Sequence, residues 1–267
     1  MSKIFFSLLP FFLFFGACTG GPRPVNYPDI DTDTSEPLLL SLPAESGLVF
    51  IGVAGKRSHP RDTVQSALEE AARRVAVFHN VSGEYLAENN IGSGAFDYTH
   101  NTRTVLYYDR EGSGRYVDLL SYNSDTDAVE IDNTLIIRTT YRAALPHPVQ
   151  YHPVYKGAEK KPDWVDNPPS TIGEYEAGIG YAGRHSTIAE ACVTSFSNAI
   201  FAIIRNVCIK SSNTDILYQG SGLFDYKTSN NNIIYASGSL SNFYVLDTWI
   251  DPANKSVWTL AIAQKSE

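Results

Sequence analysis

Cysteine is scarce in this sequence, with three residues in 267, and charged residues make up only 19%. The net charge is −8 and no long basic run occurs. Nucleic-acid binding is therefore not expected, because phosphate contacts need clustered Lys and Arg.

Cys192 and Cys208 fall on one predicted helix, about 24 Å apart along its axis. A disulfide needs Cα atoms within roughly 7 Å, so we expect two buried free thiols, and Cys18 needs another explanation.

No group of residues has the spacing of a convincing catalytic or metal site. Gly178-Ile-Gly-Tyr-Ala-Gly183 matches the G-x-G-x-x-G pattern of dinucleotide loops, but the acidic residue expected about 20 positions later falls in an apolar stretch. His147 and His152 have no Cys or carboxylate cluster beside them. His59 and His185 each precede a predicted helix and are interpreted as loop residues, with a functional pair as the alternative. We predict neither an enzyme nor a cofactor.

The N-terminus has the pattern of a targeting signal. Ile4–Phe15 is a nearly continuous apolar run after Lys3. It is too short for a stable membrane span, which takes about 20 apolar residues, and has the length of a signal-peptide core. Gly16-Ala17-Cys18 then resembles a bacterial lipobox, with small residues before a cysteine that can carry a diacylglyceryl thioether. We predict a signal peptide at residues 1–17 and lipidation, with palmitate among the acyl chains, at Cys18.

A tether is expected between this anchor and the folded part. Thr19–Pro37 is rich in Pro, Gly, Asp and Thr and poor in apolar residues, which is typical of a flexible acidic segment. We assign residues 18–44 to it. No later apolar run is expected to be long enough to cross a membrane. Thr19 is not an Asp retention signal, so the outer membrane is favoured over the inner one, with the protein facing the periplasm.

The chain repeats itself. At an offset of 126 residues, Gly52 falls on Gly178 and His59 falls on His185. At an offset of 128, Gly92-Ser-Gly-Ala-Phe-Asp-Tyr98 lies over Gly220-Ser-Gly-Leu-Phe-Asp-Tyr226, with six identities in seven positions. Such order and identity indicate a tandem duplication. The predicted fold class is α+β, with two tandem repeats of one helix packed on a small antiparallel sheet, at residues 45–145 and 162–267, joined by a linker at 146–161.

Each repeat has the same predicted order of elements. In the first, the apolar stripe predicts a helix from Asp62 to about Asn80, capped by Asp62 and Gln65. Alternating apolar residues predict strands, at Leu48–Val53, Thr102–Tyr108, Tyr116–Tyr122 and Leu135–Tyr141. In the second, the helix spans Ser186–Cys208 with Thr187 and Glu190 as its cap. Its strands are predicted at Tyr175–Tyr181, Ile233–Ala236, Phe243–Thr248 and Val257–Ala263. The glycines of Gly178–Gly183 are interpreted as a tight turn from strand to helix.

The second repeat resembles a known family. Pro162-Asp-Trp164, then Tyr175 to Gly180, an Ala-rich helix, Asp247-Thr-Trp249 and a closing strand at Trp258 are similar to the pattern of the LPP-twenty family of bacterial lipoproteins. The resemblance covers roughly 162–263, and the first repeat lacks the Pro-x-Trp opening. It implies a dodecin-like α/β fold, a lipid anchor and self-assembly, which in some relatives builds flagellar basal-disc structures. It implies no catalytic residues.

Candidate binding or interface residues come from the repeated segment and from one tryptophan. Asp97, Tyr98, Asp225 and Tyr226 could form ligand-contacting loops, although the flanking glycines are as well explained by turns. Trp164 could pack on its own domain or on a neighbouring copy, because a buried Trp contributes a large apolar area.

Two functions are compatible with these patterns. The sequence favours a lipid-anchored envelope protein with a structural or assembly role, as a homo-oligomer or with other envelope or flagellar proteins. The alternative is a binding module for a small ligand or cell-wall element, in a Tyr-lined cleft between the repeats.

Overall fold

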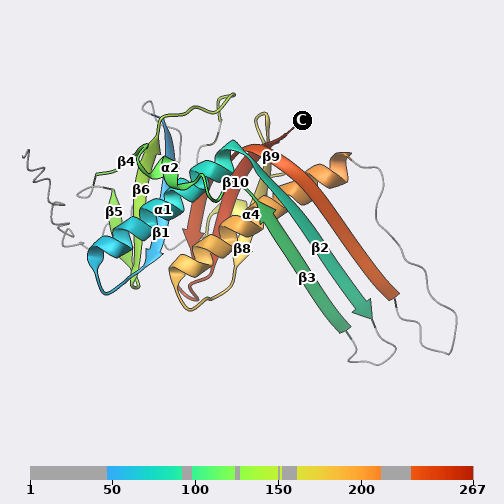
Figure 1. Ribbon diagram of the computed structural model, residues 1–267. Helices are drawn as coiled ribbons and strands as arrows, with labels where there is room; N and C mark the ends of the chain where they lie inside the picture. The colour runs from blue at the N-terminus through green and yellow to red at the C-terminus, as the bar shows by residue number, and fades with distance from the viewer. Residues whose placement is uncertain are drawn as a thin grey trace, which may run out of the picture.

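The computed structural model describes residues 47–91, 98–123, 127–149, 151, 161–211 and 230–266. Within these ranges, only the backbone is described at residues 87–101 and 208–235. Four helices and ten strands lie in these ranges (Figure 1). In chain order they are β1 Leu48–Gly55, α1 Pro60–His79, β2 Val81–Ile91, β3 Tyr98–Tyr107, α2 Gly114–Val117, β4 Leu120–Ser121, β5 Ala128–Ile131, β6 Thr134–Tyr141, α3 Asp163–Asp166, β7 Thr171–Ile172, β8 Tyr175–Ala182, α4 Ile188–Ser211, β9 Asn230–Ile250 and β10 Val257–Lys265.

The strands form two antiparallel sheets. The smaller sheet has the order β1-β6-β4, with β5 also paired to β6, and the larger has the order β3-β2-β9-β10-β8-β7. Helix α1 packs on β1 and β6, and α4 packs on β8, β10 and β9. The α+β class predicted from the sequence is therefore confirmed.

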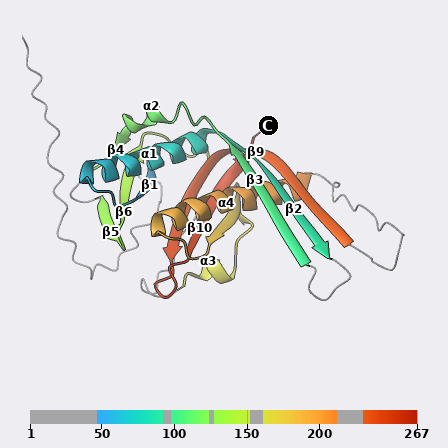
Figure 2. The same cartoon turned by 60° about the horizontal axis from the view of Figure 1, so that its bottom comes forward.

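The sheets do not follow the predicted division into two separate small sheets. Strands β2 and β3 belong by sequence to the first half, yet they lie in the sheet of the second half. The reason is the length of β9, whose first part pairs with β2 from Asn230 to Leu240 and whose second part pairs with β10. Its Ser237-Gly238-Ser239 stretch, which falls between two predicted strands, continues the ladder, and Gly238 pairs with Gly83. Figures 1 and 2 show β2, β3 and β9 leaving the body together as a three-stranded arm.

Glycines in β1 and β8 let a helix approach the strand closely. A Cβ at Gly52 would lie 2.1 Å from the carbonyl oxygen of Ala67 on α1, and a Cβ at Gly180 would lie 1.8 Å from that of Ser195 on α4. The interpretation of the glycines at 178 and 180 as a turn was therefore wrong, because β8 continues to Ala182. Close packing requires glycine here, since any Cβ would collide with helix backbone.

This contact aligns the two strand–helix units at an offset of 128. Gly52 corresponds to Gly180, and Ala67 corresponds to Ser195. The same offset superimposes the two Gly-Ser-Gly-x-Phe-Asp-Tyr segments, so no change of offset is needed. The packing contact thus favours an offset two residues from the 126-residue match of Gly52 with Gly178, and a shift of two residues leaves the same strand face inward.

Two local predictions for the first half were wrong, and one for the second half is confirmed. Helix α1 starts at Pro60 with no side-chain cap, whereas Thr63 Oγ1 accepts a hydrogen bond from the Arg57 amide at 2.9 Å. The strand predicted at 116–122 is α2 followed by the two-residue β4, because Tyr116 is buried against the end of α1. In α4 the cap is as predicted: the Glu190 amide donates to Thr187 Oγ1 at 3.2 Å.

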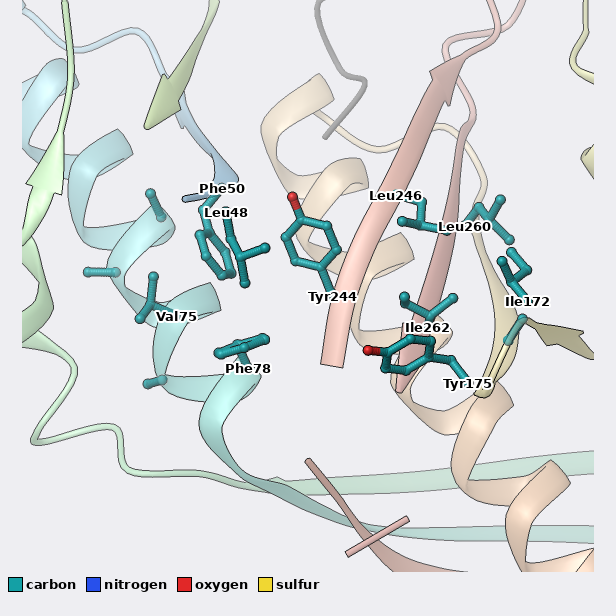
Figure 3. Packing of buried hydrophobic residues seen from close by; sticks show 14 of the residues in the cluster. Leu48, Phe50, Val75, Phe78, Ile172, Tyr175, Tyr244, Leu246, Leu260 and Ile262 are labelled. Carbon is teal, nitrogen blue, oxygen red and sulfur yellow. The ribbon is translucent and has the colours of Figure 1, made fainter. Parts of the chain in front are cut away.

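The core joins both halves through Tyr244 of β9. Its ring meets Phe50 of β1 edge-on with centroids 5.6 Å apart, and its hydroxyl accepts a hydrogen bond from the Val49 amide at 3.1 Å. Burial raises the pKa of this hydroxyl. Figure 3 shows Tyr244 between Leu48, Phe50, Val75 and Phe78 on one side and Leu246, Leu260 and Ile262 on the other. The edge amide of β1 is thus satisfied by a side chain where no strand pairs with it.

Candidate functional site

Most residues singled out in the sequence lie outside the described part of the chain. These are Cys18, Asp97, Asp225 and Tyr226. Tyr98 is the first residue of β3, and only its backbone is described. Lipidation and the ligand-loop hypothesis therefore remain predictions.

Trp164 packs into the core of its own chain. It lies on α3 and is 8% exposed. Its Nε1–H donates a hydrogen bond to Asp247 Oδ2 at 2.9 Å, and the Tyr151 hydroxyl donates to the same oxygen at 3.3 Å. Burial, followed by the charge of Asp247, raises the pKa of Tyr151. A buried carboxylate is tolerable here because it accepts these hydrogen bonds.

This bond brings two distant sequence motifs together. The Pro162-x-Trp164 opening and the Asp247-x-Trp249 element are 83 residues apart, and the indole–carboxylate bond joins them. The segment before β8 is held on the sheet by a second link, since the Tyr175 hydroxyl donates to the His147 carbonyl and accepts from the His147 amide, both at 2.9 Å. The predicted linker is therefore tied to the core at His147, Val149 and Tyr151, whereas Pro146, Pro148 and Lys161 are exposed.

The arm presents a strand edge. β3 pairs with β2 on one side, from Tyr98–Ile91 to Tyr107–Ser82, and within the described residues no strand pairs with its other side. Thr102, Arg103 and Thr104 are exposed, and Tyr107 is 54% exposed. An unpaired row of amides and carbonyls is a template for another strand.

A cleft of about 460 Å³ lies between α1 and α4. The end of β1, the middle of α1 and the first turns of α4 form its walls, so both halves of the chain contribute. The residues around it are Val53, Ala54, Gly55, Arg57, Ser66, Glu69, Glu70, Arg73, His185, Ala189, Glu190, Val193 and Thr194. It differs from the predicted Tyr-lined cleft, since its lining contains charged and small apolar side chains and no tyrosine.

The described residues offer little for catalysis. No group of three or more His, Cys, Asp or Glu within them could hold a metal ion. The thiol of Cys192 is buried, and burial raises its pKa to about 12, so it is a poor nucleophile. His59 is the exposed residue before α1 and does not line the cleft, whereas His185 does. The two histidines therefore lie in different environments.

Helix α4 is apolar because it is a core helix. Its Ile188–Val207 stretch has the length and hydropathy of a membrane span, against the expectation that no such run follows the N-terminus. However, 61% of that window is buried within the protein. One helix of this kind is weak evidence for a span, since core helices of soluble proteins have the same composition.

The cleft residues follow no recognisable pattern in the sequence, because they are scattered over β1, α1 and α4. At the offset of 128, Arg57 corresponds to His185, but this match by itself does not indicate a cleft. Comparison with protein-family models, with curated proteins and with solved structures finds no match to this chain.

Proposed function

We propose that this chain is an envelope lipoprotein with a structural role, anchored through Cys18 and assembled through the free edge of its β-arm. The lipobox supports the anchor, and the acidic tether of residues 18–44 would separate the folded part from the bilayer. The protein would face the periplasm, with the outer membrane favoured by Thr19. The resemblance of 162–263 to LPP-twenty lipoproteins supports the same role.

The proposal includes a tandem duplication. Its support is the pair of strand–helix units aligned at 128 residues, with Gly52 and Gly180 in the same contact with their helices. β1 pairs with β6 as β8 pairs with β10, in both cases antiparallel. Each unit then places its helix over its own strands.

The edge of β3 is the observation that carries the assembly role. β9 follows the second Gly-Ser-Gly-x-Phe-Asp-Tyr segment and pairs over eleven residues with β2, which precedes the first such segment. β3 follows the first segment, and its outer edge has no partner strand in the described residues. A strand from a second copy would extend the arm by the same antiparallel pairing.

Light scattering of residues 19–267, which keep every described residue, tests assembly. We expect masses above the monomer that rise with concentration. Thr102→Pro and Arg103→Pro remove neighbouring β3 amides, of which only one is directed away from β2. The outward variant should keep the fold by circular dichroism and be monomeric, whereas Thr102→Ser should assemble. A monomeric wild type at high concentration would exclude this role.

Palmitate labelling in a bacterial host tests the anchor separately. The wild type should incorporate label and sediment with membranes, and Cys18→Ala should do neither. Label retained in Cys18→Ala would show that the lipid site was assigned wrongly, without bearing on assembly of the soluble part.

A further inference from the structure

The charges around the α1–α4 cleft are only partly compensated within the protein. Glu70 is buried, and its carboxylate is bridged by Arg73 Nη1 at 2.5 Å and Arg74 Nε at 3.4 Å. Arg74 is itself buried and lies over the Phe196 ring at 4.7 Å. This network satisfies the buried Glu70 carboxylate, as a buried ion requires, and leaves one net positive charge at the inner end of the cleft.

Three further charged residues of the cleft lining, Arg57, Glu69 and Glu190, have no oppositely charged partner among the described residues. The Arg57 side chain has no hydrogen bond or ion pair with any described residue, because only its backbone amide is engaged. Glu69 accepts a hydrogen bond from the neutral Gln65 amide at 3.1 Å, and Glu190 accepts one from the Ser186 hydroxyl. One cation and two anions thus surround the cleft without opposite charges of their own.

We propose that this cleft binds a short peptide through its two termini, with the carboxylate at Arg57 and the ammonium at Glu69 and Glu190. A purely anionic ligand would meet the two carboxylates, and a purely cationic one would meet Arg57 and Arg73. A zwitterion satisfies both signs, and charge-assisted hydrogen bonds are the strong ones.

The apolar part of the lining fits a chain with small side chains. Val53, Ala54, Ala189 and Val193 line the cleft beside the charged groups. The hydroxyls of Ser66 and Thr194 also line it and have no hydrogen-bond partner within the described residues, so they can bond peptide groups. A volume of about 460 Å³ is in the range typical of small-ligand sites, roughly 300–1,000 Å³. This inference does not depend on assembly or on the lipid anchor.

Isothermal titration calorimetry of the full chain in detergent, with trialanine as the probe, tests the site. We expect saturable binding, weakened about tenfold or more when either terminus is blocked by acetylation or amidation. Arg57→Ala and Glu190→Gln should weaken it similarly. Arg184→Ala is the matched control: it removes an exposed arginine that does not line the cleft, and it should bind as the wild type does.

Three results would overturn the assignment. The first is no binding of trialanine by a wild type that is folded by circular dichroism. The second is equal affinity for free and doubly blocked trialanine. The third is displacement of trialanine by inorganic phosphate with Glu190→Gln unimpaired, which would make the cleft a general anion site.

Discussion

The units β1–α1 and β8–α4 have the same strand–helix contact but fill the neighbouring space differently. Gly52 pairs with Ile137 across the sheet and lies against the backbone of Ala67, so both neighbouring side chains are apolar. Gly180 pairs with Thr259 and lies against Ser195. The hydroxyl oxygens of Ser195 and Thr259 are 2.8 Å apart. Both units have glycine at this position because packing fixes the distance between the strand backbone and the helix backbone. The neighbouring side chains can differ between the units as long as buried polar groups find partners.

The largest effect should come from closing the space at the two glycines. Gly180→Ala and Gly52→Ala would each place a methyl group within 2.1 Å or less of a helix carbonyl. We expect each to lower the free energy of unfolding by about 3 kcal/mol, measured by urea denaturation. Gly55→Ala has no atom within 4 Å of the new Cβ and is the control. Equal stabilities for all three variants would disprove the close-packing argument.

A feature confined to the second half should have the next largest effect. Trp164→Phe keeps an aromatic ring but removes the N–H that donates to the buried Asp247. We expect a loss of about 2 kcal/mol, because a hydrogen bond to a charged buried group is lost. The control Trp258→Phe changes a less buried indole and should cost clearly less in the same urea experiment. The reverse order would mean that the carboxylate is satisfied without Trp164.

The hydroxyl pair offers a direct test of exchange between the halves. Ser195→Ala or Thr259→Val alone leaves one buried hydroxyl with fewer partners and should cost about 1–2 kcal/mol. The double variant imitates Ala67 and Ile137 of the first half and should cost less than the sum of the single changes. A double-mutant cycle measures this difference. Strict additivity would show that the two hydroxyls do not interact.

The smallest effect concerns pH and the first half alone. His79 stacks on Tyr116 with centroids 5.4 Å apart, and its Nε2 lies 3.1 Å from the Tyr141 hydroxyl. Burial, and then the charge of Arg115, lowers the pKa of His79 below 6.5. The unfolded chain therefore binds this proton first as pH falls, and stability should drop below pH 6.5, by less than about 1 kcal/mol because the ring is only partly buried.

His79→Gln should remove that pH dependence, seen as parallel urea midpoints of wild type and variant above pH 6.5 and divergence below it. At the offset of 128 residues, the position on α4 is occupied by Val207, which does not titrate. An unchanged pH profile in the variant would assign the titration to another group.

Local patterns predicted the strand–helix units well because their causes are local. Residues only a few positions apart account for the apolar stripes of α1 and α4 and for the Thr187 cap. The same holds for the strands β1, β6, β8 and β10. β2 was missed, since its polar residues give no clear alternation and its stability comes from β3 and β9. β strand formation depends strongly on such neighbours.

The candidate cleft could not be predicted for a related reason. Arg57, Glu69 and Glu190 come from a loop and two helices, and no spacing in the sequence indicates that they surround one volume. The tyrosines expected in a cleft are used elsewhere: Tyr244 joins the halves and Tyr175 fixes the segment before β8.

The sequence alone determined the α+β class, the repeated Gly-Ser-Gly segments and the expectation of a lipid anchor, because composition and short periodic patterns carry that information. Only the tertiary structure decided that β2 and β3 join the sheet of the other half, that Trp164 bonds Asp247, and which charges meet between α1 and α4. These depend on contacts between residues far apart in the chain, whose free energy exists only when both partners are already held in place.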